Sequence, residues 1–483
     1  MTVADRSAGR GDSPALADDL RAYYQAERAS FHMPGHKQRL AALHPLAGEI
    51  LGAAAIRADV SEIGGFDYLH SPEGPIVVAQ QRAATTFGAD RTFFLVNGST
   101  GGNLSAITAF AGDGDQILML RGSHRSVYTG AALSGAMPRY LSMIHDVVHD
   151  GWFVAEAPPF DGNLAVIHIT RPNYYGMACD LAPYVELANR TGAILVVDEA
   201  HGSHFGLHPD LPRSALQEGA DVVIQSTHKT LGALTQASML HVRGTRADPD
   251  RLARSLQMLQ SSSPSALLTL SLDLAAAQVA NEGRSMMNRT VALARYVRHA
   301  VAAIPGLCLL GDELLDGTIV ALDPTKIVID VAGLGGSGFR AARFLKEHER
   351  INVELADHRR IVCSLTIGDD EDSAAVLVRA LTSLARSAPD ADRAASASLP
   401  AIPELVETPH RALQLPTASA MMADVVDRTC AEYVIPYPPG IPIVVPGERL
   451  TAEVVASIRG FRAAGSRIVG PVDPTGERLL VLV

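Results

Sequence analysis

The sequence predicts an α/β fold, in which a mostly parallel central sheet is covered by helices on both faces. Between about residues 75 and 245, helical patterns alternate with short apolar runs that are bounded by polar or turn residues. Such runs, bridged by helical segments, are typical of strands buried in a parallel sheet. The chain has 483 residues and is 47% hydrophobic, which is enough for a large core and several domains.

The elements of the large domain are expected in a regular order. Residues 1 to about 18 are small and polar and are expected to be flexible, and a short helix is predicted at 16–28. Helical patterns then occupy 75–88 and 101–112. Strands are predicted from the apolar runs at 91–96, 116–120, 164–169, 193–200 and 221–226.

Beyond the large domain, a long helical stretch at about 264–304 leads to predicted strands at 326–331 and 360–367. An Ala-, Ser- and Pro-rich stretch then indicates a linker. The prolines of 433–448 exclude a long helix there. The predicted parts are an N-terminal arm (1–30), a large cofactor-binding domain (31–285), a small α/β domain (286–385), a linker (386–409) and a C-terminal domain (410–483).

Composition argues against several classes of protein. The formal net charge of −11 disfavours nucleic-acid binding, although an acidic surface is compatible with a cationic substrate. No apolar run is long enough to span a membrane and no secretory signal is recognisable, so a cytoplasmic protein is expected. The four cysteines are widely spaced and form no C-x-x-C pair, so they are predicted to be buried, reduced thiols, with no metal site.

The residues that follow each predicted strand are the first candidates for a functional site, because ligands of parallel α/β sheets bind beyond the C-terminal strand ends. The strand at 91–96 runs into Asn97–Asn103, where a helix is predicted to begin. The backbone N–H groups there and the hydroxyls of Ser99 and Thr100 suit a phosphate. An ordinary helix cap is the alternative, since the segment is neither a P-loop nor a dinucleotide fingerprint.

Two further strands end beside polar side chains. Asp198 stands at the end of a buried run and is followed by His201. A buried carboxylate is costly without a partner, so Asp198 suits a protonated ring nitrogen, with capping of the next turn as the alternative. His124 follows the strand at 116–120, where its flat ring suits stacking on a flat ligand, although a lone histidine is more often structural.

Lys229 follows the strand at 221–226 and is one of only four lysines in the chain, with Lys37, Lys326 and Lys346. Arginine supplies nearly all the other positive charge, but it stays protonated, whereas the pKa of a lysine can be tuned for attack on a carbonyl. Ser226, Thr227 and His228 beside it suit a second wall of a phosphate site. A solvated lysine in a polar loop is the alternative.

Together, these strand ends supply a phosphate cradle, a partner for a planar ring, a buried carboxylate and an amine. Pyridoxal phosphate needs these parts, since it takes a lysine Schiff base and an acidic partner for its pyridinium nitrogen. The residues therefore predict a pyridoxal-phosphate enzyme.

The chain resembles the bacterial ornithine/lysine/arginine decarboxylases, from residue 31 to 448. The motifs that carry this resemblance are FHMPGHK, FLVNGSTGGN, NYYG, VDEAHGSH, STHKTLGALTQAS, SSSPS with SLD, DPTKI and YPPGIP. The resemblance implies the aspartate-aminotransferase-like fold of pyridoxal-phosphate transferases, loss of CO2 from a basic amino acid to give an amine, and a homodimer or small oligomer.

The resemblance also implies roles for the matched residues. Lys229 would bond covalently to the cofactor, Asp198 would pair with the pyridine nitrogen, and His124 would stack on the ring. His201 would lie near the ring or the substrate carboxylate, and Lys229 or His228 would return a proton to Cα. The phosphate would be held by Ser99, Thr100, Ser226 and His228. Ser263 would lie near the site of a neighbouring subunit, and Glu354 is a candidate for substrate contact.

The chain departs from the family pattern at several positions. Many relatives begin with a receiver-like wing domain, whereas this chain starts near the core, which favours a dimer or small oligomer. Tyr68, Asn173 and Ala266 replace residues common in relatives, and RGSHRS replaces a related motif, so specificity is expected to be affected there. Arginine is favoured slightly over lysine and ornithine as substrate.

Two alternatives remain at the level of sequence. Transamination on the same scaffold would use the same lysine and aspartate, but would yield a 2-oxo acid without release of CO2. A non-catalytic regulatory paralogue is the alternative of a different class, and the intact set of Lys229, Asp198 and His124 argues against it.

Overall fold

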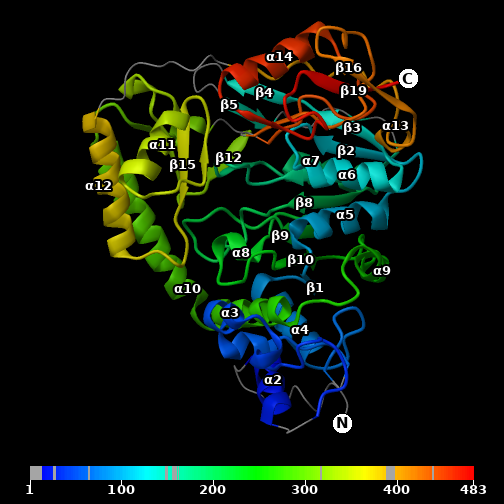
Figure 1. Cartoon of the computed structure of the whole chain (residues 1–483), viewed down its shortest axis with the longest axis vertical. Helices are drawn as coiled ribbons and strands as arrows, with labels where there is room; N and C mark the ends of the chain where they lie inside the picture. Colours follow the sequence, from blue (N-terminus) through cyan, green and yellow to red (C-terminus); the bar gives the residue numbers. More distant parts are fainter. Residues whose placement is uncertain are drawn as a thin grey trace.

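A seven-stranded sheet forms the centre of the computed structural model, which describes residues 14–25, 29–63, 66–146, 151–154, 160, 163–315, 318–387, 397–437 and 440–483 (Figure 1). The strands follow the order β1-β10-β9-β8-β6-β2-β3. Their bounds are β1 Arg91–Leu95, β2 Gln116–Leu120, β3 Met137–Leu141, β6 Leu164–Thr170, β8 Ile194–Asp198, β9 Val222–Gln225 and β10 Ser238–Val242. Only β10 runs against its neighbours, so the predicted mostly parallel sheet is confirmed.

The five predicted strands of the large domain are all present, as β1, β2, β6, β8 and β9. The prediction missed β3 and β10. Strand β10 carries a fully buried histidine, His241, whose ring bonds to the Thr92 hydroxyl at 2.8 Å and to Gln225 Oε1 at 3.2 Å. Burial lowers the pKa of His241 to about 3, so it is a neutral hydrogen-bonding group inside the sheet.

Helices cover both faces of the sheet, because residues along each strand alternate between two cores. In β2, Ile117 and Met119 face one core, while Leu118 and Leu120 face the other. The helices of this part are α3 Pro45–Ala58, α4 Pro75–Phe87, α5 Gly98–Phe110, α6 Arg125–Ser134, α7 Ala182–Thr191, α8 Thr227–Thr230 and α9 Pro249–Leu259, with a 3-10 turn η1 at Leu40–Ala42. Short strands β4 Met143–Asp146, β5 Gly151–Val154 and β7 Met177–Cys179 lie outside the main sheet.

The first helix, α2 (Ala15–Gln25), begins inside the stretch expected to be flexible. Leu16 is fully buried, and its backbone N–H donates to Asp273 Oδ2 at 3.0 Å. Asp273 also accepts from Arg82 at 2.9 Å. The expected flexibility is therefore wrong at residues 15–18, because an apolar contact and a buried carboxylate fix the start of α2.

A second, four-stranded sheet forms the small α/β part, with β11 Cys308–Leu309, β13 Lys326–Asp330, β14 Leu355–Ala356 and β15 Arg360–Ser364. The predicted strands at 326–331 and 360–367 correspond to β13 and β15. The long helix α10 (Ala266–Ala302) runs from the large sheet to this part, as predicted. The remaining elements here are α11 Gly338–His348, α12 Glu371–Ser387, β12 Ile319–Leu322, η2 Asp312–Leu314 and η3 Ala332–Leu334.

The C-terminal part packs beside β2, β3 and α6, although these elements lie far from it in the sequence (Figure 1). A bidentate ion pair anchors it, since Arg121 donates to the two carboxylate oxygens of Glu448 at 2.6 and 2.9 Å. His410 Nδ1 also donates to the Ala132 carbonyl at 2.8 Å. The elements are α13 Pro409–Ala412, β16 Thr417–Met421, β17 Ile435–Tyr437, α14 Ala452–Ala463, β18 Arg467–Val469 and β19 Arg478–Leu482, so no long helix crosses the proline-rich stretch.

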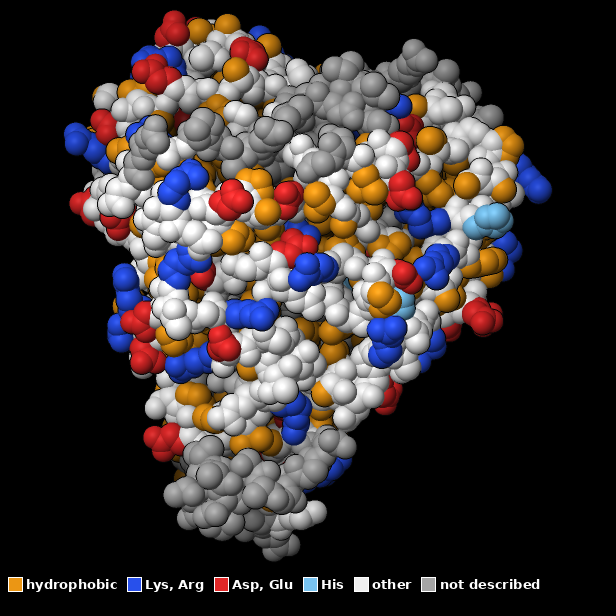
Figure 2. Space-filling model, turned by 180° about the vertical axis from the view of Figure 1, so that it is seen from behind, with side chains coloured by type: hydrophobic (Ala, Val, Ile, Leu, Met, Phe, Trp, Pro, Cys, Tyr) orange, Lys and Arg blue, Asp and Glu red, His pale blue; other side chains and the backbone are white. Residues whose placement is uncertain are grey.

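The surface mixes charges of both signs. On the face shown in Figure 2, Lys and Arg side chains are interspersed with Asp and Glu side chains. Within the described ranges, no helix has the length and apolarity needed to cross a bilayer. All four cysteines are free, as predicted, but only three are buried. The exception is Cys308, which is exposed because β11 forms an edge of the small sheet.

Candidate active site

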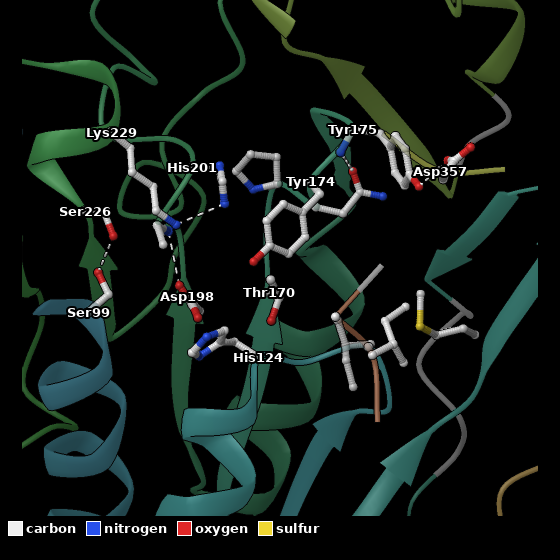
Figure 3. A pocket seen from close by; sticks show the side chains of 18 of the residues that line it. Ser99, His124, Thr170, Tyr174, Tyr175, Asp198, His201, Ser226, Lys229 and Asp357 are labelled. Atoms are coloured by element: carbon white, nitrogen blue, oxygen red, sulfur yellow. Dashed lines mark hydrogen bonds between the residues drawn. The ribbon is translucent and has the colours of Figure 1, made fainter. Parts of the chain in front are cut away.

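The carboxyl ends of five strands, β1, β2, β6, β8 and β9, meet at one pocket of about 320 Å³. They share an edge because all five run in the same direction. Strand β1 has this direction because β10, which lies between β1 and β9, is antiparallel to both. Eight of the predicted site residues line this pocket: Ser99, Thr100, His124, Asp198, His201, Ser226, His228 and Lys229. Figure 3 labels all of them except Thr100 and His228.

One wall of the pocket carries hydroxyl groups at the start of α5. Ser99 Oγ lies 2.7 Å from Ser226 Oγ, which joins the segment after β1 to the segment after β9. Gly102 brings this helix close to the sheet, because a Cβ there would lie 2.8 Å from side-chain atoms of Leu95 and Ile224. The free N–H groups of the first turn of α5 and the two serine hydroxyls therefore form a concave donor set for an anion.

Asp198 ends β8 and is almost completely buried. Its Oδ2 accepts from Asn103 Nδ2 at 2.8 Å, and its Oδ1 accepts from the backbone N–H of Ala200 at 3.1 Å. Asn103 is fixed in turn, because its Oδ1 bonds to His168 Nε2 at 3.1 Å. Burial lowers the pKa of His168 to about 4, which keeps that ring neutral. Neutral donors thus hold the carboxylate in one orientation.

His124 caps the N-terminus of α6 and is held by Ser126. Its Nδ1 lies 2.8 Å from Ser126 Oγ and accepts from the backbone N–H of Ser126 at 3.2 Å. Burial lowers the pKa of His124, although the Asp198 carboxylate opposes this effect. The ring is therefore neutral and fixed in place opposite Asp198 (Figure 3).

Lys229 projects from α8 into the pocket, and its Nζ lies 3.0 Å from His201 Nε2 (Figure 3). Burial lowers the pKa of Lys229; Asp198 opposes this shift, while the positive charge of Lys326 adds to it. A lowered pKa increases the fraction of neutral amine, which is the form that attacks a carbonyl. His228, the neighbour of Lys229, donates from Nδ1 to the Ala237 carbonyl at 2.9 Å.

Several residues that also line the pocket were not predicted from the sequence. The ring centroid of Tyr174 lies 4.7 Å from that of His201, and the Tyr175 hydroxyl donates to Asp357 Oδ2 at 2.8 Å. The small and C-terminal parts contribute Asp357, His358, Arg360, Gly440, Ile441 and Phe461. The NYYG motif was the available signal for the tyrosines. The others have no local signature, because distant segments bring them to the pocket.

The positions that depart from the family pattern lie in different settings. Asn173 lines the pocket, but its Oδ1 accepts from the backbone N–H groups of Tyr175 and Met177, so it holds a turn. The Tyr68 hydroxyl donates to the Ser262 carbonyl at 3.2 Å. Ala266 is buried at the start of α10, within a small apolar cluster.

Two predicted site residues, Ser263 and Glu354, are not among the residues that line the pocket. Both are exposed. Glu354 is nonetheless close enough to raise the pKa of Lys229 against the lowering effect of burial. The roles of Ser263 at a neighbouring subunit's site and of Glu354 near the substrate stay predictions.

Comparison with known proteins places this chain in a family. A sequence model of the Orn/Lys/Arg decarboxylase major domain matches residues 14–373, and a model of the C-terminal domain of the same family matches residues 394–468. The arginine decarboxylase of Bacillus subtilis (strain 168) is 37% identical over 481 residues, which cover 97% of each chain.

Solved structures share the fold. The constitutive lysine decarboxylase of Escherichia coli superimposes with a TM-score of 0.81 at 22% identity, over 98% of this chain and 82% of that one. An alanine–glyoxylate aminotransferase from Nostoc sp. superimposes with a TM-score of 0.51 at 18% identity, over 64% of this chain and 86% of that one. The predicted aminotransferase-like fold is thus confirmed, and the chain belongs to the Orn/Lys/Arg decarboxylase family.

Proposed function

We propose that this protein removes CO2 from a basic L-amino acid with the help of pyridoxal 5'-phosphate. Arginine is favoured as substrate, ahead of lysine and ornithine. One observation carries the proposal: a single pocket joins the Lys229 amine, the buried Asp198 carboxylate, the His124 ring and the hydroxyl wall at α5. Family membership supports the reaction class.

The chemistry of this donor set fits the cofactor. Ser99, Thr100 and Ser226, with the N–H groups of α5, suit the phosphate, while Asp198 suits the protonated ring nitrogen. His124 is positioned to stack on the ring. Bound there, the cofactor supplies an electron sink for the pair of electrons left on Cα when CO2 departs.

The chain's own residues bind, orient and move protons. The Lys229 amine, whose pKa burial lowers, would be the nucleophile that holds the cofactor covalently. The pocket residues would have to orient the substrate so that the bond from Cα to the carboxylate is the one that breaks. Lys229 in its ammonium form and His228 protonated on Nε2 are the candidate donors of the proton that replaces CO2. The neutral His228 ring carries its hydrogen on Nδ1, where it donates to the Ala237 carbonyl. The apolar side chains of Ile441 and Phe461 limit access of water to the pocket.

One observation favours arginine over the other basic amino acids. The relative that matches nearly the whole chain at 37% identity is named arginine decarboxylase, whereas the structural neighbour at 22% identity is a lysine decarboxylase. The acidic balance of the chain also suits a cationic substrate. Glu354 is exposed near Lys229 and is our candidate for contact with the substrate's cationic head group.

A substrate panel tests the proposal. The purified protein, loaded with the cofactor, is incubated with arginine, lysine or ornithine, while CO2 release and products are measured. We expect CO2 together with agmatine from arginine, faster than CO2 from lysine or ornithine. A 2-oxo acid without CO2 would instead establish transamination, and no turnover of any basic amino acid would defeat the substrate assignment.

We infer further that the protein acts as a homodimer through its N-terminal segment. The segment 29–63 exposes large apolar side chains, among them Phe31 (94% exposed) and Ile50 (73% exposed). Apolar groups gathered on one surface indicate an interaction site. Ser263, predicted to lie near a neighbouring site, is also exposed.

Light scattering on the eluting protein tests the dimer. The native chain is expected to show twice its 51.1 kDa mass, and Ile50→Glu is expected to shift the mass towards one chain, because a buried charge is costly. Val472→Glu is the matched control, since Val472 is equally exposed but lies in the C-terminal part. A native mass of 51.1 kDa at micromolar concentration would contradict the dimer.

A further inference from the structure

Lys326 is a buried lysine that the proposed reaction does not use. It lies on β13 of the small sheet, and only 4% of it is exposed. Its Nζ donates to Ser364 Oγ at 2.7 Å and lies 3.5 Å from His201 Nδ1. A buried ammonium group is costly to maintain, so its placement against an active-site histidine calls for a physical account.

His201 lies between two lysine amines. Its Nε2 is 3.0 Å from the Nζ of Lys229, and its Nδ1 is 3.5 Å from the Nζ of Lys326. A neutral imidazole has one N–H donor and one acceptor nitrogen, whereas an ammonium group only donates. One neutral ring cannot accept hydrogen bonds from two ammonium groups. Both contacts of His201 are therefore hydrogen bonds only when one of the two lysine amines is unprotonated.

The state of His201 follows from its surroundings. Burial lowers its pKa well below the ordinary value, and the neighbouring basic groups Lys229, Lys326, His124 and His204 lower it further. The ring is therefore neutral. It accepts at one nitrogen and donates at the other, and the two lysines decide which nitrogen carries the hydrogen.

The surrounding charges favour Lys326 as the protonated amine. Burial lowers the pKa of Lys326, but Asp323 and Glu354 oppose that shift. Burial by itself would raise the pKa of Asp323. Two neighbours lower it overall: His204, whose Nε2 lies 3.1 Å from Asp323 Oδ2, and Thr325, which donates hydrogen bonds to it. Asp323 is therefore ionised. Burial and the charge of Lys326 lower the pKa of Lys229, against the raising effects of Asp198 and Glu354, whereas burial alone lowers the pKa of Lys326.

The backbone of the NYYG motif makes room for this lysine. Gly176, with φ +82°, faces the Lys326 stem, and a Cβ there would lie 2.9 Å from both Cβ and Cγ of Lys326. The tight turn therefore leaves space for the Lys326 stem, whose amine lies beside Ser364 and His201. The NYYG turn and strand β13 lie far apart in the sequence, and together they position the Lys326 amine.

We propose that Lys326 is a positioning residue that fixes His201 in the tautomer with hydrogen on Nε2, and so keeps the Lys229 amine neutral and oriented. In this arrangement the Lys326 ammonium donates to His201 Nδ1, and His201 Nε2–H donates to the lone pair of Lys229 Nζ. The inference rests on the proposed function only in taking Lys229 as the reactive amine.

The first test reads the tautomer of His201 in cofactor-free protein labelled with ¹⁵N-histidine, with a His201→Gln variant assigning its ring signals. We expect a protonated Nε2 and an unprotonated Nδ1 in the native protein. Lys326→Met should give a mixture of tautomers. Lys326→Arg should keep the native tautomer, because it retains a charged donor. Lys346→Met should also keep it, because it removes only an exposed lysine.

The second test follows the rate at which an amine-reactive reagent labels Lys229 as pH is varied, with the labelled peptide quantified by mass spectrometry. Lys326→Met removes a like charge, so the pKa of Lys229 rises and the labelling curve is expected to move to higher pH by roughly half a unit to one unit. Lys346→Met should leave the curve unchanged.

Two outcomes would overturn the inference: hydrogen on Nδ1 of His201 in the native protein, or a tautomer pattern and labelling curve unchanged by Lys326→Met. Should Lys326→Met fail to fold, Ser364→Ala removes the hydroxyl that anchors the same amine, and a native tautomer pattern in that variant would overturn the inference. Neither readout involves turnover, so a failed substrate panel would defeat the proposed function without touching this inference.

Discussion

Replacing Lys229 with alanine is expected to reduce decarboxylation by a factor of about 10³ or more, because the substitution removes both the nucleophile and a candidate proton donor. The hydroxyl wall, Asp198 and His124 are untouched, so the variant should still bind pyridoxal phosphate to some degree. Covalent capture should be lost. The measurement is the protein mass after borohydride treatment, which should increase by the reduced cofactor only when Lys229 is present.

Lys346→Ala is the control, since it removes an exposed lysine of α11 and leaves the pocket intact. It should retain both activity and the mass increase. Normal turnover by the Lys229→Ala variant would remove the basis of the proposed function. A mass increase that persists in that variant would assign the covalent bond to another amine.

Asp198→Asn is expected to lower kcat by about 10² to 10³, which corresponds to roughly 3 to 4 kcal/mol of barrier height. The amide has nearly the same shape as the carboxylate, but carries no charge to hold the ring nitrogen protonated. The pKa of Lys229 should also fall, because Asp198 raises it in the native protein. The labelling curve of Lys229 should therefore move to lower pH, opposite to the shift expected for Lys326→Met.

Asp250→Asn is the matched control, because its side chain is 73% exposed in a surface ion pair with Arg91, and such pairs contribute little. It should change neither kcat nor the labelling curve. An Asp198→Asn variant with native kcat would mean that this carboxylate serves only the packing around Asn103. A shift of the labelling curve to higher pH would contradict the electrostatic assignment.

Much of this site was predictable, because it is built from strand ends. The apolar runs that became β1, β2, β8 and β9 are local patterns, and a parallel sheet brings their carboxyl ends to one edge whatever the rest of the chain does. Ser99, His124, Asp198 and Lys229 were therefore found from their positions just beyond those runs. The resemblance to a family then supplied roles that periodicity alone does not assign.

The partners of those residues were not predictable in the same way. The sequence predicts only that Asn103 lies at the start of a helix, and the structure shows that its side-chain amide also orients Asp198. Strand β10 was missed because His241 interrupts its apolar run, and only pairing with Gln225 and Thr92 makes that histidine a core residue. The exposed Cys308 and the ordered start of α2 likewise depend on what each segment packs against.

The sequence by itself determined the fold class and supplied the proposal of a cofactor site with Lys229 as its amine, since each follows from local hydrophobic pattern and from the residue after a strand. Only the tertiary structure decided how that amine is surrounded. His201 and Lys326 are 125 positions apart, and their contact depends on how the small sheet sits against the large one. Electrostatic effects on a lysine act over a few ångströms, so distances set by packing, and not separation along the chain, determine its protonation.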